Sequence, residues 1–255
     1  MRRLTEHLGC QVETAQTAEA HTPWQEEPAG KKPPIGQAFS ADGASVPLVQ
    51  GEWAEVRTLA IGEVQEQCTS DGTTEIHVEH LLYFSRLTDA QPFSDLAEVE
   101  MRRRRVIQAE QVCAVTDGAD WLQQFSDLHR SDAVRNLDLP PAAEHITQLL
   151  EAFEKAGKQF PAQMRERCLH VLKHRAPRPL LRMAHRLSPD LTELEGVREH
   201  LGYLRKRELL MPYPQFQHPG WPIGSGMVES ANKLVVEARL KGAGRHWQPS
   251  HVNPM

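Results

Sequence analysis

The sequence has few cysteines and no long apolar run. Its four cysteines, Cys10, Cys68, Cys113 and Cys168, are far apart among 255 residues and form no CxxC pair. This spacing argues against a structural zinc site of the CxxC type and fits reduced thiols in the cytosol. No run of about 18 apolar residues could cross a membrane, and the N-terminus lacks the apolar stretch of a secretory signal. We therefore expect a cytoplasmic protein without a membrane partner.

Charge is unevenly divided along the chain. Residues 1–100 contain 6 Lys and Arg against 17 Asp and Glu, whereas residues 101–255 contain 23 against 17. The most basic part, residues 163–186, holds seven Lys or Arg and a single Glu. A basic C-terminal part is compatible with a nucleic-acid partner, although basic patches are often only solvated faces.

The order of the predicted elements indicates an α/β protein. Stretches rich in Val, Ile, Thr and aromatic residues predict three antiparallel strands in meander order, within residues 37–49, 52–64 and 74–85. Short apolar runs predict two further, parallel strands at 112–116 and 133–138. Helical patterns are found at 2–19, 92–110, 119–129, 141–157, 161–208 and 227–240. In the last of these, Leu234, Val235, Ala238 and Leu240 are expected to form the buried side.

Three antiparallel strands followed by parallel strands with helices is the ribonuclease-H-like (RNase-H-like) architecture. We predict a mixed sheet of this kind, with a helical insertion before the last helix. The expected division is an N-terminal segment and linker at 1–36, an RNase-H-like catalytic domain at 37–144 and 222–255, and the helical insertion at 145–221.

Three acids lie where this architecture could bring them together. Asp42 is on the first predicted strand, Asp117 ends the fourth, and Glu229 is in the first turn of the last helix. Carboxylates suit Mg²⁺ or Mn²⁺, and two such ions about 4 Å apart can activate a water or a 3′-hydroxyl in phosphodiester chemistry. We therefore expect a site for two ions, with carboxylates roughly 4–8 Å apart. The alternative for the last helix is an ordinary surface helix with a Glu229–Lys233 ion pair.

Six stretches of the sequence resemble a known family. They read ADGASVPL, GEWAEVRTLAIGEV, YFSRLTDA, VTDGADWLQQFSDLH, LDLPPAAEHI and GSGMVESANKLVVEARLKGAGRHW. From about Phe39 to the C-terminus, except in the helical insertion, the chain resembles bacterial insertion-sequence transposases of the ISKra group. These are DDE-type enzymes related to the mutator-like transposases. The resemblance maps the three catalytic and metal-binding acids to Asp42, Asp117 and Glu229.

The resemblance implies cleavage of DNA by water and transfer of a 3′-hydroxyl into target DNA. The expected cofactors are two Mg²⁺ or Mn²⁺ ions. The expected partners are double-stranded DNA, at the transposon ends and the target, and further copies of the chain in a homo-oligomer. A cytoplasmic protein with these partners would associate with the nucleoid.

The sequence departs from the family in ways that leave alternatives open. The family has a D-x-x-H pattern where this chain has Asp138 followed by Leu139, Pro140 and Pro141, so the His is absent. Family members extend further at both ends, which implies a truncated copy. A catalytically inactive remnant that binds DNA or regulates transposition is therefore the alternative function. A different RNase-H-like nuclease, such as a resolvase, is a third possibility, against which the GSGMVES stretch and the long insertion argue.

Three further groups of residues carry weaker signals. Lys233, Arg239, Lys241, Arg245 and Trp247 are candidates for DNA contact, where Trp247 could stack on a base or instead pack the Gly242–Gly244 turn onto the core. Cys168, His170 and His174 have a spacing that can bind zinc, with an exposed basic helix face as the alternative. The basic residues of the insertion, Arg165, Arg167, Lys173, Arg175 and Arg178, are expected to be exposed.

Overall fold

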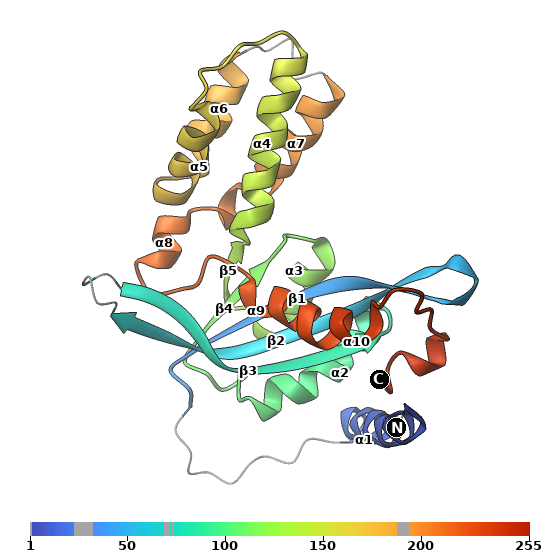
Figure 1. Ribbon diagram of the computed structural model, residues 1–255. Helices are drawn as coiled ribbons and strands as arrows, with labels where there is room; N and C mark the ends of the chain where they lie inside the picture. The colour runs from blue at the N-terminus through green and yellow to red at the C-terminus, as the bar shows by residue number, and fades with distance from the viewer. Residues whose placement is uncertain (1, 23–32, 69–71, 73, 188–193) are drawn as a thin grey trace.

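A five-stranded mixed sheet forms the centre of the protein (Figure 1). The computed structural model describes residues 2–22, 33–68, 72, 74–187 and 194–255. The sheet order is β3-β2-β1-β4-β5, from strands β1 (Gly36–Pro47), β2 (Trp53–Cys68), β3 (Thr74–Leu87), β4 (Gln111–Thr116) and β5 (Val134–Leu137). β1, β2 and β3 are antiparallel, whereas β4 runs parallel to both β1 and β5. The predicted α/β class and all five predicted strands are confirmed.

The two faces of the sheet bury different clusters because side chains alternate along each strand. Phe39 and Ala41 of β1 pack against α2 (Ala90–Arg103) and α3 (Asp120–Arg130) on one face. Ala38 of β1 belongs to the cluster on the other face, with α4 (Leu139–Lys155) and α9 (Gly226–Ala231). β4 is covered on both faces, which explains its uninterrupted apolar sequence.

The first helix and the end of the chain lie together. Helix α1 (Arg2–Ala20) lies beside α2, below the sheet in Figure 1. Asn253 donates a hydrogen bond of 2.8 Å from its side-chain amide to the carboxylate of Glu13. The helix predicted at 2–19 is therefore confirmed, whereas most of the predicted linker, residues 23–32, lies outside the described residues.

A group of helices that follows β5 and precedes α9 in the sequence stands above the sheet (Figure 1). Besides α4 it contains α5 (Met164–His174), α6 (Pro177–Leu187), α7 (Glu195–Lys206) and the short α8 (Tyr213–Gln217). Pro141 lies in the first turn of α4, where a missing N–H costs little. Residues 188–193 of the predicted helical region lie outside the described residues. Over the ranges that the structure describes, no helix combines the length and apolar character needed to cross a bilayer.

The last helix contains a π-helical segment that rotates its buried face. It is formed by α9, the π-helical η4 (Asn232–Glu237) and α10 (Ala238–Leu240). The prediction of a helix at 227–240 is confirmed, but the predicted buried side is wrong except for Leu240. Leu234 is 64% exposed, and the buried side contains Ala231 and Val236, five residues apart. A π turn closes hydrogen bonds five residues apart, so the α-helical spacing used for the prediction fails here.

Candidate active site

The register of β1 and β4 brings Asp42 and Asp117 to neighbouring positions. Ala38 of β1 pairs with Cys113 of β4, and Asp42 and Asp117 each follow their strand's paired residue by four positions. The hydroxyl of Ser40 donates to the carbonyl of Val115 at 2.7 Å, which keeps the two strands together between these points. The even spacing places both acids on the sheet face that α9 covers.

Asp42 is partly buried, and its carboxylate accepts two hydrogen bonds. The amide of Gly43 donates to its Oδ1 at 2.7 Å, and the side-chain amide of Asn232 donates to its Oδ2 at 2.9 Å. Burial raises the pKa of Asp42 above its ordinary value. The negative charge of Asp117, and to a lesser extent that of Glu55, also raises this pKa, whereas both donors lower it. The two acids are therefore close enough to repel each other.

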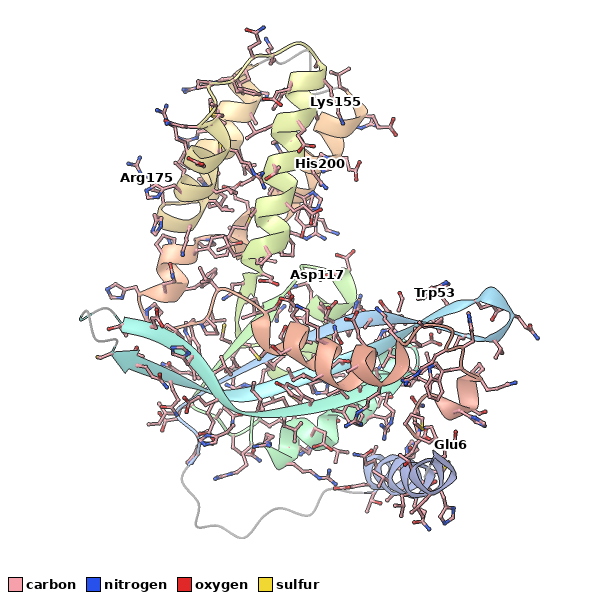
Figure 2. The ribbon with its side chains drawn as sticks, viewed as in Figure 1. Glu6, Trp53, Asp117, Lys155, Arg175 and His200 are labelled. Atoms are coloured by element: carbon pink, nitrogen blue, oxygen red, sulfur yellow. The ribbon has the colours of Figure 1, made fainter. Side chains whose placement is uncertain are left out.

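Asp117 begins the loop between β4 and α3 and is exposed. Its Oδ1 accepts a hydrogen bond of 2.8 Å from the amide of Ala119, and its backbone carbonyl accepts one of 2.8 Å from the hydroxyl of Tyr203 on α7. Figure 2 shows Asp117 at the edge of the sheet, below the upright group of helices. The predicted position at the carboxyl end of a parallel strand is confirmed.

Asp138 lies at the end of β5, the strand beside β4. It is 8% exposed and accepts hydrogen bonds from both the amide, at 3.0 Å, and the hydroxyl of Ser225. Burial raises the pKa of Asp138, the bonds from Ser225 lower it, and the nearby charge of Glu229 raises it. The charge of Glu229 therefore acts on Asp138 at the end of the strand beside β4.

Glu229 lies between two residues that each donate a hydrogen bond to another acid. Ser225, just before α9, donates to the carboxylate of Asp138, and Asn232, just after α9, donates to that of Asp42. The helix thus runs from the end of β5 to β1, with Glu229 between these contacts. Its exposed carboxylate pairs with Lys233 at 2.6 Å, which is the ion pair of the alternative interpretation.

The three predicted acids do not form a preformed metal-binding site in this structure. No group of three His, Cys, Asp or Glu side chains within the described residues is arranged to hold a metal ion. The charge of Asp117 acts on Asp42, whereas the charge of Glu229 acts on Asp138 and its carboxylate is bound to Lys233. The same finding applies to Cys168, His170 and His174, because Cys168 is buried whereas the two His side chains lie towards the surface of α5.

Sequence reasoning missed four residues that shape this site: Asn232, Ser225, Tyr203 and Arg207. Asn232 could have been found, since it follows Glu229 by three residues and so shares its helix face. Tyr203 and Arg207 contact the Asp117 loop from more than 80 residues away, and the sequence contains no signal for that pairing.

Trp247 is part of the core. It is 5% exposed and donates a hydrogen bond of 2.8 Å from its indole to the carbonyl of Leu240. Its backbone also pairs with the β1–β2 connection at Leu48. Of the two alternatives for Trp247, the structure shows packing into the core, and stacking on a base stays a prediction.

The other candidates for DNA contact lie on and beyond the last helix. Lys233 and Lys241 each pair with a Glu four residues earlier, Glu229 and Glu237, at 2.6 and 2.7 Å. Arg239 and Arg245 donate to backbone carbonyls of the same C-terminal region. DNA contact by these four residues stays a prediction.

Comparison of the chain with models of known protein families found no match, and comparison with curated proteins found none either.

Proposed function

We propose that this chain contains an RNase-H-like transposase catalytic domain that cuts DNA and transfers a 3′-hydroxyl with the help of divalent cations. The observation that carries the proposal is that Asp42 of β1 and Asp117, which directly follows the adjacent strand β4, occupy neighbouring positions and repel each other. Two neighbouring carboxylates that repel each other are the arrangement expected for a cation site.

The topology supports the same class of protein. The order β3-β2-β1-β4-β5, with three antiparallel strands and two parallel ones, is compatible with the RNase-H-like sheet. Helices α4–α8 come between the strand that precedes Asp138 and the helix that carries Glu229. In this proposal they form the helical insertion between the second and third acids.

The donor set around Asp42 fits a hard cation such as Mg²⁺ or Mn²⁺. Carboxylate and amide oxygens are the ligands that these ions prefer. Asn232 donates through its amide nitrogen to Asp42, while its Oδ1 is buried and has no hydrogen-bond partner among the described residues. Asp42 and Asp117 would hold the ion, and Glu229 could join them after leaving Lys233. A bound ion of this kind activates a water or 3′-hydroxyl and stabilises the leaving oxygen.

The groups of the protein would contribute mainly position and charge. Asp42 is fixed by Gly43 and Asn232, and Asp117 is fixed by its backbone contacts, so neither carboxylate needs to reorganise widely before reaction. Placing reactants in this way, in a site that matches the developing charge, can account for much of a phosphoryl-transfer rate.

A basic surface on α5 and α6 supports the assignment of DNA as the partner. The prediction that these residues are exposed is confirmed for Arg165, Arg167, Lys173, Arg175 and Arg178. Figure 2 shows Arg175 at the outer side of the helical group. Arg178 pairs with Glu208 at 2.8 Å, so the other four are the stronger candidates for phosphate contact.

The proposal is tested by a nicking and strand-joining assay on DNA with Mn²⁺ or Mg²⁺. We expect wild-type protein to cut DNA only with the metal, and Asp42→Asn, Asp117→Asn and Glu229→Gln each to lose cleavage. Asp127→Asn is the matched control, because this exposed acid of α3 pairs with Arg135 of β5, away from the three acids. Equal cleavage by wild type and all three site variants would refute the proposal.

The alternative function is DNA binding without catalysis. The Glu229–Lys233 ion pair and the Pro at 141 in place of the family's His favour it. Such a protein would bind DNA with strong salt dependence and show no metal-dependent nicking, so the same assay separates the two functions.

A further inference from the structure

Helix α7 contacts the loop that follows β4 through one face of its last turns. The hydroxyl of Tyr203 donates to the carbonyl of Asp117 at 2.8 Å. The guanidinium of Arg207, directly after the helix, donates from Nε to the carbonyl of Gly118 at 3.1 Å. Lys206 pairs with the carboxylate of Asp120 at 2.7 Å. Two successive backbone carbonyls and one side chain just after β4 are thus bound from the same helix end.

Tyr203 is itself held on both sides of its ring. The His145 ring of α4 stacks on it with centroids 3.6 Å apart and an angle of 9°. The guanidinium carbon of Arg207 lies 3.8 Å from the same ring centroid. Two groups this close to one centroid must lie on opposite faces, so Tyr203 is sandwiched. His145 is fixed in turn by His200, with the two Nδ1 atoms 3.1 Å apart.

The loop backbone is shaped to fit these contacts. Gly118 has a φ of +80°, a conformation that residues with a side chain rarely adopt. A Cβ at this position would lie 2.3 Å from Nε of Arg207 and 2.9 Å from Leu137. The close approach of Arg207 therefore depends on the absence of a side chain at 118.

We infer that Tyr203 and Arg207 are positioning residues for Asp117. They bind the carbonyls of the Asp117–Gly118 and Gly118–Ala119 peptides, one on each side of Gly118, and so determine where the Asp117 carboxylate lies relative to Asp42. The inference rests on the proposed function for its consequence, cation binding, but not for the contact itself. The helical region would then complete the site from outside the sheet.

The chemistry of Tyr203 suits a donor role. A backbone carbonyl oxygen can only accept a hydrogen bond, so the phenol hydroxyl of Tyr203 is the donor to the carbonyl of Asp117.

The test compares two Tyr→Phe variants. Tyr203→Phe removes only the hydroxyl and keeps the ring between His145 and Arg207. Tyr213→Phe is the matched control, since the buried hydroxyl of Tyr213 has no hydrogen-bond partner among the described residues. We expect hydrogen exchange at the amides of Gly118 and Ala119 to become about tenfold faster in Tyr203→Phe, as for loss of one hydrogen bond, and to stay unchanged in the control.

The second readout is Mn²⁺ affinity, measured by titration calorimetry. We expect it to fall about tenfold in Tyr203→Phe. In an Asp117→Asn background the same substitution should have no further effect, because a residue that acts through Asp117 is not additive with it. A purely structural role would instead give additive effects.

The two readouts separate the inference from the proposed function. If wild-type protein binds no Mn²⁺, the proposed cation site fails, while the exchange measurement still decides whether α7 fixes the loop. Unchanged exchange at Gly118 and Ala119 in Tyr203→Phe, or a loss of Mn²⁺ affinity that persists in the Asp117→Asn background, would overturn the positioning role.

Discussion

The side-chain amide of Asn232 donates a hydrogen bond of 2.9 Å to the carboxylate of Asp42, which lies 190 residues earlier in the chain. This contact joins the last helix to the central strand at the first candidate acid. It favours the charged form of Asp42 and lowers its pKa, against burial and the charge of Asp117. The helix therefore influences the protonation of Asp42 as well as the position of Glu229.

Removing this donor should raise the pKa of Asp42 further. In Asn232→Ala the carboxylate loses a donor while it remains partly buried, so we expect the NMR titration of the Asp42 carboxyl carbon to move to higher pH. Stability at neutral pH should fall by about 1–3 kcal/mol, as for other hydrogen bonds to buried charges. Asn253→Ala is the control, because Asn253 bonds Leu87 and Glu13 away from the site. An unchanged titration of Asp42 would contradict the role of Asn232.

A second prediction concerns the pH dependence of stability. A carboxyl group whose folded-state pKa is raised stabilises the fold below its unfolded pKa, and this contribution is lost as pH rises through the folded pKa. Asp42 and Asp138 both have raised pKa values. We therefore expect Asp42→Asn to have a higher Tm than wild type at pH 7, and an equal one at acidic pH, where wild-type Asp42 is protonated. A difference of about 1 kcal/mol would appear as about 2–4 °C in thermal melts.

The opposite result would also be informative. If Asp42→Asn lowered the Tm at pH 7, the carboxylate would be stabilising the fold, and the self-repulsion that supports a cation site would be absent. A gain in stability together with loss of cleavage is the pattern expected when a site is built for function at a cost in stability.

The sequence predicted the order of elements well because that order depends on local patterns. The apolar run before Asp117, the turn residues between β1, β2 and β3, and Pro141 at the start of α4 all act within a few residues. The neighbouring positions of Asp42 and Asp117 could be anticipated too, since both are tied to strands that must pair in one sheet.

Contacts between distant segments could not be predicted in the same way. The exposure of Leu234 follows from a π turn, which has no clear sequence signature. The burial of Trp247 depends on its bond to Leu240 and its pairing with Leu48. The contact of Tyr203 with Asp117 depends on how α7 is placed above the sheet, which the packing of α7 against α4 and α6 determines.

A third prediction isolates the close approach of Arg207. Gly118→Ala should destabilise the protein by about 1–3 kcal/mol, because a Cβ would be strained at φ +80° and would meet Arg207 and Leu137. Gly157→Ala is a matched control, with φ +88° and nothing within 4 Å of the new Cβ. Denaturant unfolding of both variants gives the contribution of the close approach as the difference. Equal destabilisation would mean that the backbone conformation alone requires Gly118.

A fourth prediction concerns the basic surface of α5. Reversing the charge of Arg167, Lys173 and Arg175 together should weaken DNA binding uniformly across sequences. It should also make the negative slope of log K against log salt shallower, by about 0.9 for each phosphate that the variant no longer neutralises. Fluorescence anisotropy between low and high salt measures both quantities. Reversal of Arg239, Lys241 and Arg245 provides the comparison at the other candidate surface, and an unchanged slope for the α5 set would assign the DNA-binding surface elsewhere.

The last prediction decides between the two interpretations of Glu229. Lys233 holds the carboxylate of Glu229, and the bond to Glu229 raises the pKa of Lys233, so the ammonium competes with any cation for that carboxylate. Lys233→Gln should therefore strengthen Mn²⁺ binding several-fold if Glu229 is the third ligand. Both side chains are exposed, and exposed pairs of this spacing contribute little to stability, so the Tm should change little.

Lys241→Gln is the matched control for this experiment. It removes an equivalent pair, with Glu237, further along the same helix. Mn²⁺ affinity that rises in Lys233→Gln but not in Lys241→Gln would assign Glu229 to the cation site, since a general change in surface charge would affect both variants alike. Equal affinities in wild type and both variants would instead make Glu229–Lys233 an ordinary surface pair. The cation would then be held by Asp42 and Asp117, without Glu229.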